Sequence, residues 1–360
     1  MNINITTLTP VHIGNGTELQ GNTEYLYFDK EKKIAIIDAM KVLTILGEDR
    51  IGDWVACIEK NEPLLPLLKT HRPTIHTSDV GLRSIPLSIG TSKPIREHIH
   101  RCDGKALVPG SSLKGAIRTT VWADTIFENE NMARDRRNLG NTDQRGGFRW
   151  SDSFLNKTFF GNDPNHDIFR LLQVGDATFT KTEVYQTDVV NKYGDNWRIK
   201  PEITQFVEAI SVGEEATLRL NHNDILKSRS QETFNKNAEK LKLSELFPLM
   251  NNHTKRLVDD EIAFWDDKEG NPTVMGIYVD EMLKIQEAID TCTKNECVLR
   301  IGWGSGFRSM TGDWHGIMND DDYFNLIKSL RPKHPEDLMF PKTTRFIKGG
   351  MPLGFIKLSY

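Results

Sequence analysis

The segment LVPGSSLKGAIRT, residues 107–119, has the composition of a turn that starts a helix and could hold an anion. Pro109 and Gly110 would turn the chain out of a strand, and Ser111 or Ser112 would cap a helix that begins near Leu113. The unpaired N–H groups at a helix start, together with the helix dipole, favour a negatively charged ligand. The sequence therefore predicts a phosphate site at this turn.

Basic residues follow this turn at helical spacing. Lys114 and Arg118 lie one turn apart and add positive charge to the predicted site. Ala116 and Ile117 stand where a nucleotide-binding P-loop requires Lys and Ser or Thr, so hydrolysis of ATP or GTP is not predicted. The alternative to phosphate binding is a capped helix with solvated basic side chains.

Two windows of the chain are locally basic. Six basic and two acidic residues lie between Lys93 and Arg118, a local net charge of +4. A second window, residues 134–149, has a net charge of +3 and includes Arg136, Arg137 and an aromatic residue, with another directly after it. Cations beside aromatic rings suit single-stranded nucleic acid, because phosphates bind the cations and bases stack on the rings. The alternative for the second window is a solvated loop.

A third candidate is the loop GWGSGFRSMTGDWH, residues 302–315. Its glycines, Gly302, Gly304 and Gly306, would let the backbone approach a ligand closely, and Arg308 could contact a phosphate. Trp303 and Phe307 could stack on bases. The alternative is a tight turn with both aromatic side chains in the core.

Cleavage of RNA is the alternative to binding. His12, Lys114 and Arg118 could serve a metal-independent nuclease if their segments converge, but a single histidine in a turn is more often a packed, hydrogen-bonded residue. The carboxylate runs that a metal-dependent nuclease would need are predicted to be solvated helix caps and turns; they are Asp259, Asp260, Glu261, Asp320, Asp321 and Asp322. Binding is favoured, and no catalytic residue, metal or cofactor is predicted.

The elements expected to position these segments alternate between strands and helices. Strands are predicted at 2–9, 24–28, 34–38, 95–110 (as a hairpin), 171–187, 203–222, 297–303 and 352–360. Helices are predicted after Asp38, across 53–60, after the turn at Gly110, and within 230–265 and 280–290. Long loops are predicted at 129–160 and 187–200. This mixture predicts an α+β fold rather than a doubly wound parallel sheet.

Composition limits the class of protein. In a chain of 360 residues, 38% hydrophobic residues suffice for a buried core, and the net charge of −4 excludes a protein that coats nucleic acid over its whole surface. No apolar run could cross a membrane and no signal peptide is recognised, so a cytoplasmic location is expected. Four cysteines without a CxxC pair indicate neither disulfides nor structural zinc; they are Cys57, Cys102, Cys292 and Cys297.

Three motifs together resemble the RAMP superfamily of CRISPR effector proteins. They are TPVHIGNGTEL at residues 9–19, LVPGSSLKGAIRT at 107–119, and GWGSGF at 302–307 followed by PLGFIKL. The best resemblance is to the fifth subunit of type III-A complexes. It covers the ends and first third of the chain, while residues 128–295 match loosely, mainly through TFFGND and LLQVGDA.

The resemblance implies a ferredoxin-like (RRM-like) core with helical and loop insertions, whose glycine-rich loops bind guide RNA. It implies a non-catalytic subunit that caps the filament at the 3′ end of the guide, adjoins the repeating backbone subunits and supports guide maturation, with host nucleases as further partners. The implied division is 1–127, 128–295 and 296–360. Carried onto this chain, the loop contacts fall on His12, Gly14, Gly16, Ser111, Ser112, Lys114, Arg118, Gly302, Gly304, Gly306 and Arg308.

Overall fold

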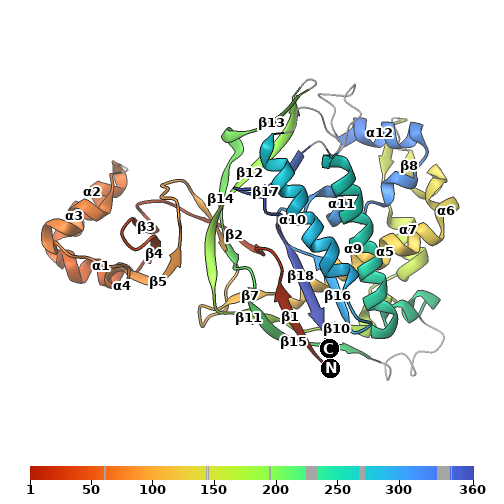
Figure 1. The fold of residues 1–360 in the computed structure, drawn as a ribbon, viewed down its shortest axis with the longest axis horizontal. Helices are drawn as coiled ribbons and strands as arrows, with labels where there is room; N and C mark the ends of the chain where they lie inside the picture. Colours follow the sequence, from red (N-terminus) through yellow and green to blue (C-terminus); the bar gives the residue numbers. More distant parts are fainter. Residues whose placement is uncertain are drawn as a thin grey trace.

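The computed structural model describes residues 1–60, 62–142, 144, 146–193, 196–223, 234–266, 272–330, 341 and 343–360 (Figure 1). Strands from both ends of the chain form its main sheet. β1 (Asn2–Thr7) pairs antiparallel with β15 (Glu215–His222) on one side and with β18 (Phe355–Ser359) on the other. β10 (Leu172–Val174) continues the sheet beyond β15, and β16 (Glu296–Arg300) continues it beyond β18.

The connections between these strands give the sheet a ferredoxin-like topology. The order β18-β1-β15-β10 is the 4-1-3-2 order of a βαββαβ unit. Helix α5 (Gly110–Glu128) lies between β1 and β10 in the chain, and α9 (Leu243–Asp266) and α10 (Thr273–Asp290) lie between β15 and β18. The predicted α+β class with a ferredoxin-like core is therefore confirmed. Strands from all three predicted segments, 1–127, 128–295 and 296–360, share this sheet. The boundaries between these segments stay a prediction.

Alternation in β1 explains which face of the sheet is covered. Ile3 and Ile5 are fully buried, whereas Asn2 and Asn4 beside them are exposed. The buried side chains join one hydrophobic cluster with Leu113 of α5. The helices therefore lie on the apolar face, as Figure 1 shows for α5 and α9.

A second sheet stands beside the first. Its order is β13 (Asn196–Ile199), β12 (Thr182–Tyr193), β14 (Gln205–Ile210), β6 (Ile95–His98) and β2 (Gly14–Leu19), and β17 (Thr343–Ile347) pairs with β12. The short strands β7 (Ala106–Val108) and β11 (Ala177–Phe179) pair with each other. Part of the first glycine-rich loop forms β2 of the second sheet, whereas the second loop follows β7 and the third follows β16 of the main sheet.

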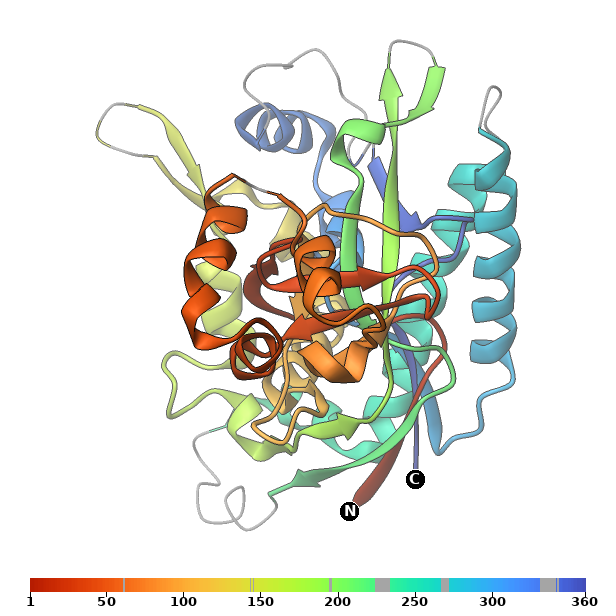
Figure 2. The ribbon, with the colours of Figure 1, turned by 90° about the vertical axis from the view of Figure 1, so that its left-hand side faces the viewer.

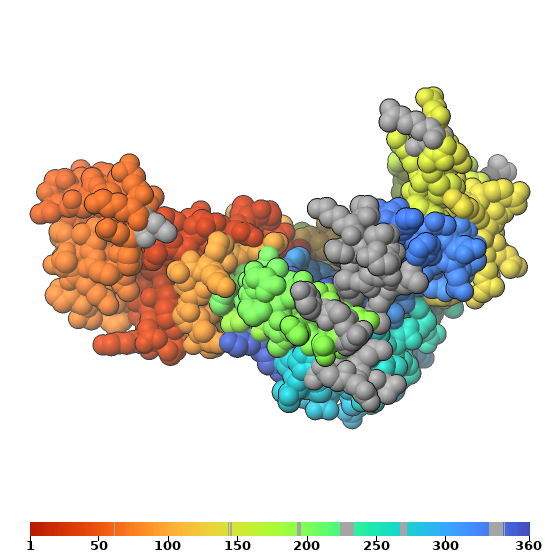
Figure 3. Space-filling view, turned by 90° about the horizontal axis from the view of Figure 1, so that it is seen from above, coloured from red at the N-terminus to blue at the C-terminus, as the bar shows by residue number. Residues whose placement is uncertain are grey.

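Residues between β2 and β6 form a lobe with a core of its own. It contains β3 (Tyr25–Phe28), β4 (Lys33–Ile37), β5 (Gly81–Pro86), α1 (Ala39–Leu46), α2 (Ile51–Glu59), α3 (Leu64–His71) and α4 (Thr77–Val80). The predicted hairpin and helices are confirmed here, and the Asp38 side chain caps α1 by accepting from the N–H groups of Met40 and Lys41. Figure 3 shows the lobe at one end of the molecule and residues near 150 at the other, both projecting to the same side of the middle.

The two segments predicted as long loops contain regular structure, so that prediction was wrong. Residues 129–160 form α6 (Glu130–Arg134), β8 (Gly140–Thr142), β9 (Phe148–Trp150) and α7 (Ser153–Phe160). In the second segment, residues 187–193 belong to β12 and residues 196–199 form β13, which pairs antiparallel with it; Figure 2 shows both strands reaching the top of the molecule. Sparse apolar residues anchor both segments in the cores, among them Leu155, Phe160, Val190 and Trp197.

The remaining elements follow the third glycine-rich loop or link the longer ones. Residues in the middle of this loop form the short helix α11 (Gly306–Thr311). Helix α12 (Asp320–Leu330) follows the loop. Short 3-10 helices span Glu48–Arg50, Arg136–Asn138, Ile168–Leu171, Pro201–Ile203, Lys236–Leu241 and Trp314–Ile317. The predicted helical stretch 230–265 begins as an α-helix only at Leu243, and residues 224–233 lie outside the described part of the chain. Within that part, no helix is long and apolar enough to span a bilayer.

Candidate nucleic-acid interface

The first and third glycine-rich loops meet, although almost 300 positions separate them. The N–H of Trp303 donates a hydrogen bond to the carbonyl oxygen of His12 at 2.9 Å. Gly302 has a φ of +78°, and a Cβ atom there would lie 2.5 Å from the same oxygen. Only glycine satisfies both the backbone conformation and the close approach. The joint between the two loops therefore depends on Gly302.

The other predicted glycines have different surroundings. Gly16 and Gly306 have positive φ angles and open space where a side chain would project, while Gly14 lies on β2 against the His12 ring. Gly304 has a φ of +84°, and its absent side chain would meet Leu353 at 2.9 Å and the Cδ of Arg345 at 3.7 Å. Gly16 and Gly306 thus leave the backbone accessible, whereas Gly302 and Gly304 permit tight packing.

Two arginines converge on the Trp303 ring. The Cζ of Arg345, on β17, lies 4.5 Å from the ring centroid, and the Cζ of Arg96, on β6, lies 5.3 Å from it. The His12 ring contacts it edge-on with the centroids 5.6 Å apart. Guanidinium groups over an indole ring are attracted by its π electrons. Trp303 therefore holds cations in place; the sequence indicated Arg96 only as part of a basic window and gave no signal for Arg345.

His12 is a core residue. Its side chain is buried, and its Nδ1 lies 2.6 Å from the carbonyl oxygen of Glu208. Burial lowers the pKa of His12, and the hydrogen bond to Glu208 only partly opposes this. The ring is therefore neutral near pH 7, donates from Nδ1 and lacks the exposure that a base acting on bound RNA would need.

The start of α5 differs from the prediction. The helix begins at Gly110 rather than near Leu113, its N-cap is Pro109, and no serine side chain caps it. The N–H of Gly110 instead donates to the Asp176 carboxylate at 2.7 Å. Pairing of β11 with β7 brings this carboxylate to the helix start, where its charge is favourable. The expected cap was wrong because an acid from a distant segment takes its place.

Arg118 and Lys114 differ in how much charge they leave available. Arg118 donates two hydrogen bonds to Asp167, at 2.8 and 3.0 Å, and one to Asn156 at 2.9 Å, and it also lies over Phe160 and Phe169. Lys114 forms no ion pair with any described residue, and burial lowers its pKa. Of the two, Lys114 has the free positive charge, while Arg118 holds α5 to α7 and its neighbours.

Most of the other predicted cations are also paired within the protein. Arg136 lies over Phe148 at 4.4 Å and 3.5 Å from Asp322, and Arg137 pairs with Asp135. Arg308 lies 3.7 Å from Asp313 and 4.0 Å from Asp260. Their positive charge is therefore largely balanced, and Arg145 of the same basic window lies outside the described residues.

Two grooves adjoin at α11. One, of about 530 Å³, is bordered by Trp303, Gly304, Arg308 and Arg345; the other, of about 490 Å³, is bordered by Arg118 and several aromatic side chains. Phe307 and Met310 border both grooves. The third loop and the Arg118 side of α5 thus belong to one continuous surface, although Lys114 borders neither groove.

Some members of both carboxylate runs have partners among the described residues. Glu261 accepts hydrogen bonds from Arg300 at 3.0 Å and from the Tyr278 hydroxyl at 2.7 Å. Asp322 is buried, contrary to the predicted solvated cap, because Asn319 donates to it at 2.7 Å and Arg136 pairs with it. Glu261 and Asp322 are thus held within the protein, whereas Asp320 and Asp321 are exposed in the first turn of α12, as predicted.

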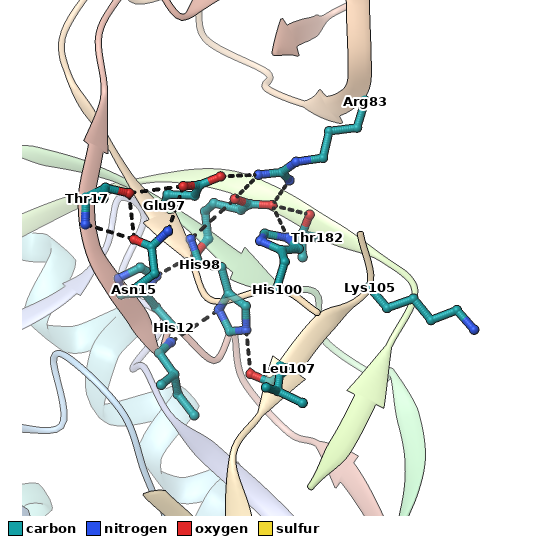
Figure 4. A network of polar contacts seen from close by, with 12 residues as sticks. His12, Asn15, Thr17, Arg83, Glu97, His98, His100, Lys105, Leu107 and Thr182 are labelled. Carbon is teal, nitrogen blue, oxygen red and sulfur yellow. Dashed lines mark hydrogen bonds and ion pairs between the residues drawn. The ribbon is translucent and has the colours of Figure 1, made fainter. Parts of the chain in front are cut away.

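A buried ionic network lies behind the first loop (Figure 4). Glu208, on β14, is fully buried and binds the forked guanidinium of Arg83, the His100 ring at 3.1 Å and the Thr182 hydroxyl at 2.8 Å. Burial alone would raise the pKa of Glu208, but the hydrogen bonds from His100 and Arg83 outweigh it and lower the pKa to about 2. This network was not predicted; its signal in the sequence was a charged residue inside the apolar strand FVEAI.

The same network explains a cluster that resembles metal ligands. Glu97, His100 and Glu208 have ligand atoms within 4.8 Å of one another. Arg83 contacts both carboxylates, with its Nη2 2.9 Å from Glu97 and 3.0 Å from Glu208. A guanidinium therefore supplies the positive charge that a cation would otherwise provide.

Two proteins of known name have sequences similar to this chain. The "CRISPR system Cms protein Csm5" of Streptococcus thermophilus is 31% identical over 149 residues, which cover 37% of this chain and 41% of that protein. The protein with the same name from Methanocaldococcus jannaschii is 25% identical over 399 aligned positions, covering 100% of this chain and 88% of that one. The aligned part thus spans about two fifths of the first relative and most of the second.

Solved structures share the fold over nearly the whole chain. A chain in a cryo-EM structure of a Csm-crRNA-target RNA ternary complex of a type III-A CRISPR-Cas system matches with a TM-score of 0.72 at 20% identity, covering 100% of both chains. The crystal structure of T. onnurineus Csm5 matches with a TM-score of 0.64 at 18% identity, covering 98% of this chain and 99% of that one. The sequence pattern of the RAMP superfamily matches residues 4–307, so the chain belongs to the RAMP superfamily.

Proposed function

We propose that this chain is a guide-RNA-binding subunit of a type III-A CRISPR effector complex. In this role it would cap the filament at the 3′ end of the guide, contact the neighbouring backbone subunits and support guide maturation in antiviral defence. The full-length relative named Csm5 and the structural similarity to a chain of a Csm-crRNA complex support this role. Host nucleases that trim the guide are further partners in the proposal.

The observation that carries the proposal is the joint between the first and third loops. Trp303 and His12 are hydrogen-bonded through their backbones, and the accessible Gly306 borders a groove together with Arg308 and Arg345. Gly16, on the first loop, is also accessible. Accessible backbone and cationic side chains along a groove suit the sugar-phosphate chain of RNA. Lys114, in the first turns of α5, adds a positive charge that forms no ion pair within the described part of the chain.

We propose that this chain binds the guide RNA and does not cleave RNA. His12, the base of the alternative nuclease, is buried and hydrogen-bonded to Glu208, and Arg118 is held by Asp167. Neither side chain is presented as a free catalytic group on the groove. The proposal therefore assigns cleavage of RNA to other subunits of the complex.

The test is a reconstituted complex that carries a guide RNA and either wild-type chain or Gly302→Val. The valine would clash with the His12 carbonyl, so we expect loss of crosslinks between the guide and this chain and faster exonuclease trimming of the guide 3′ end. Gly213→Val is the matched control, because Gly213, in the turn between β14 and β15, also has a positive φ of +76° but has open space around it. Wild-type chain that enters the complex without crosslinking to the guide would contradict the proposed function.

A further inference from the structure

Arg96 and Arg345 form an arginine clasp around Trp303, in which the acidic partners among the described residues are more distant or weaker than those of Arg118. Arg345 donates a hydrogen bond to the Thr187 hydroxyl at 3.1 Å and forms no ion pair with any described residue. Burial, followed by the charge of Arg96, lowers the pKa of Arg345 to about 10, and the charge of Asp188 opposes this only in part. Its charged form is thus destabilised in the protein as it stands, and an added anion would relieve this.

Arg96 shows the same incomplete pairing. Its Nη2 lies 3.4 Å from Glu18, whose side chain is 43% exposed, and this is a weak, solvent-screened contact. Its Nε is buried and has no hydrogen-bond partner among the described residues. A buried donor left unpaired destabilises the folded protein, so such groups usually have a ligand or a water as partner.

The geometry of the clasp keeps both guanidinium groups in place without neutralising them. Each lies within 5.3 Å of the Trp303 centroid, so the indole orients them while adding no negative charge that would compensate theirs. Gly304 beside Arg345 cannot carry a side chain, because one would meet Leu353. Arg345 and Trp303 border the same groove of about 530 Å³. The arginine clasp thus combines fixed donors, unpaired charge and an adjoining groove.

We propose that the arginine clasp of Arg96 and Arg345 is a phosphodiester-binding site for the RNA strand, and that Trp303 positions it. The inference rests on the proposed function and deepens it. Guanidinium groups match phosphate oxygens in geometry and charge, and such contacts are independent of base sequence. The clasp therefore fixes the backbone of the RNA, while Arg118 and Arg308, which are paired with acids, hold the protein together.

The test compares wild-type full chain with Arg96→Met/Arg345→Met. Methionine keeps much of the packing against Trp303 and removes both charges. A labelled single-stranded RNA oligonucleotide is titrated with each protein at several salt concentrations. We expect affinity to fall about tenfold to a hundredfold per arginine at low salt. The slope of log K against log salt should become shallower by about 0.7 for each phosphate that is no longer bound. The control, Arg50→Met/Arg72→Met, removes two exposed charges from the lobe and should leave both quantities unchanged.

Thermal unfolding of the same variants separates binding from a structural role. Removing two partly buried, poorly paired like charges should leave Tm unchanged or raise it, because the folded protein no longer holds them together. A fall in Tm of several degrees that accompanies the loss of binding would assign the clasp to stability and overturn the inference.

The failures of the two proposals can be told apart. If wild-type chain binds RNA and the clasp variant binds it equally, with the same salt slope, the clasp is not the phosphate site, although the proposed function stands. If the variant binds RNA normally but fails to join the other subunits, the clasp recognises a protein and the inference is wrong. If wild-type chain binds RNA neither alone nor within the complex, the proposed function itself fails.

Discussion

Replacing Arg83 with methionine is expected to destabilise the protein by about 3–5 kcal/mol, because it leaves the Glu208 carboxylate buried without its main counter-charge. Glu208 is fully buried, and Arg83 binds it through both Nη atoms. The remaining partners, His100 and Thr182, satisfy only part of its charge. Arg83 lies on β5 of the lobe and Glu208 on β14 of the second sheet, so the loss should also loosen the lobe, with faster amide hydrogen exchange in β5.

Urea denaturation gives the free energy of unfolding for this test. The double variant Arg83→Met/Glu208→Gln should recover much of the loss, since it removes both charges together. The control is Arg50→Met, which removes a guanidinium that pairs on the surface with Asp53 at 3.0 Å and should cost less than about 1 kcal/mol. A cost for Arg83→Met as small as that of the control would refute the importance of the network.

Lowering the pH from 7 to 5 is expected to remove about 4 kcal/mol of stability through two buried histidines. Burial lowers the pKa of His98 to about 3, with a smaller effect from His12, and burial with Arg256 nearby lowers the pKa of His253 to about 3. The unfolded chain binds these protons below about pH 6.5, whereas the folded chain does not. Stability is therefore complete above about pH 6.5 and falls by about 1.4 kcal/mol per pH unit for each histidine until the pH approaches about 3.

The carboxylate of Glu208 acts in the same direction at lower pH. Its folded pKa of about 2 lies below the ordinary glutamate value of 4.5, so its contribution is present above 4.5 and is lost as the pH falls toward 2. The measurement is the urea midpoint at several pH values. His253→Leu should make the dependence between about pH 6 and 4 shallower by about 1.4 kcal/mol per unit. A variant of the exposed His71 should retain the wild-type slope, and a wild-type stability independent of pH in this range would contradict the assignment.

Local patterns in the sequence are enough to predict most elements and the topology class. Alternation of apolar and polar residues marks β1, and Asp38 before an apolar helical pattern marks α1 with its cap. The glycines of the third loop mark its positive φ angles. These features depend on neighbouring residues alone, which is why composition and spacing suffice for them. The prediction failed for the polar segments 129–160 and 187–200, because a few apolar residues, buried only by distant contacts, decide their structure.

Which charges are available for a ligand depends on contacts between distant parts of the chain. Arg118 looks free in the sequence, but Asp167 pairs with it; Asp176 takes the place of the predicted serine cap at the start of α5. Conversely, β6, the third loop and β17 bring Arg96, Trp303 and Arg345 together without a strong acidic partner for either guanidinium among the described residues. Coulomb energy and hydrogen bonding depend on separations of a few ångströms between residues far apart in the chain, and no local pattern encodes those separations.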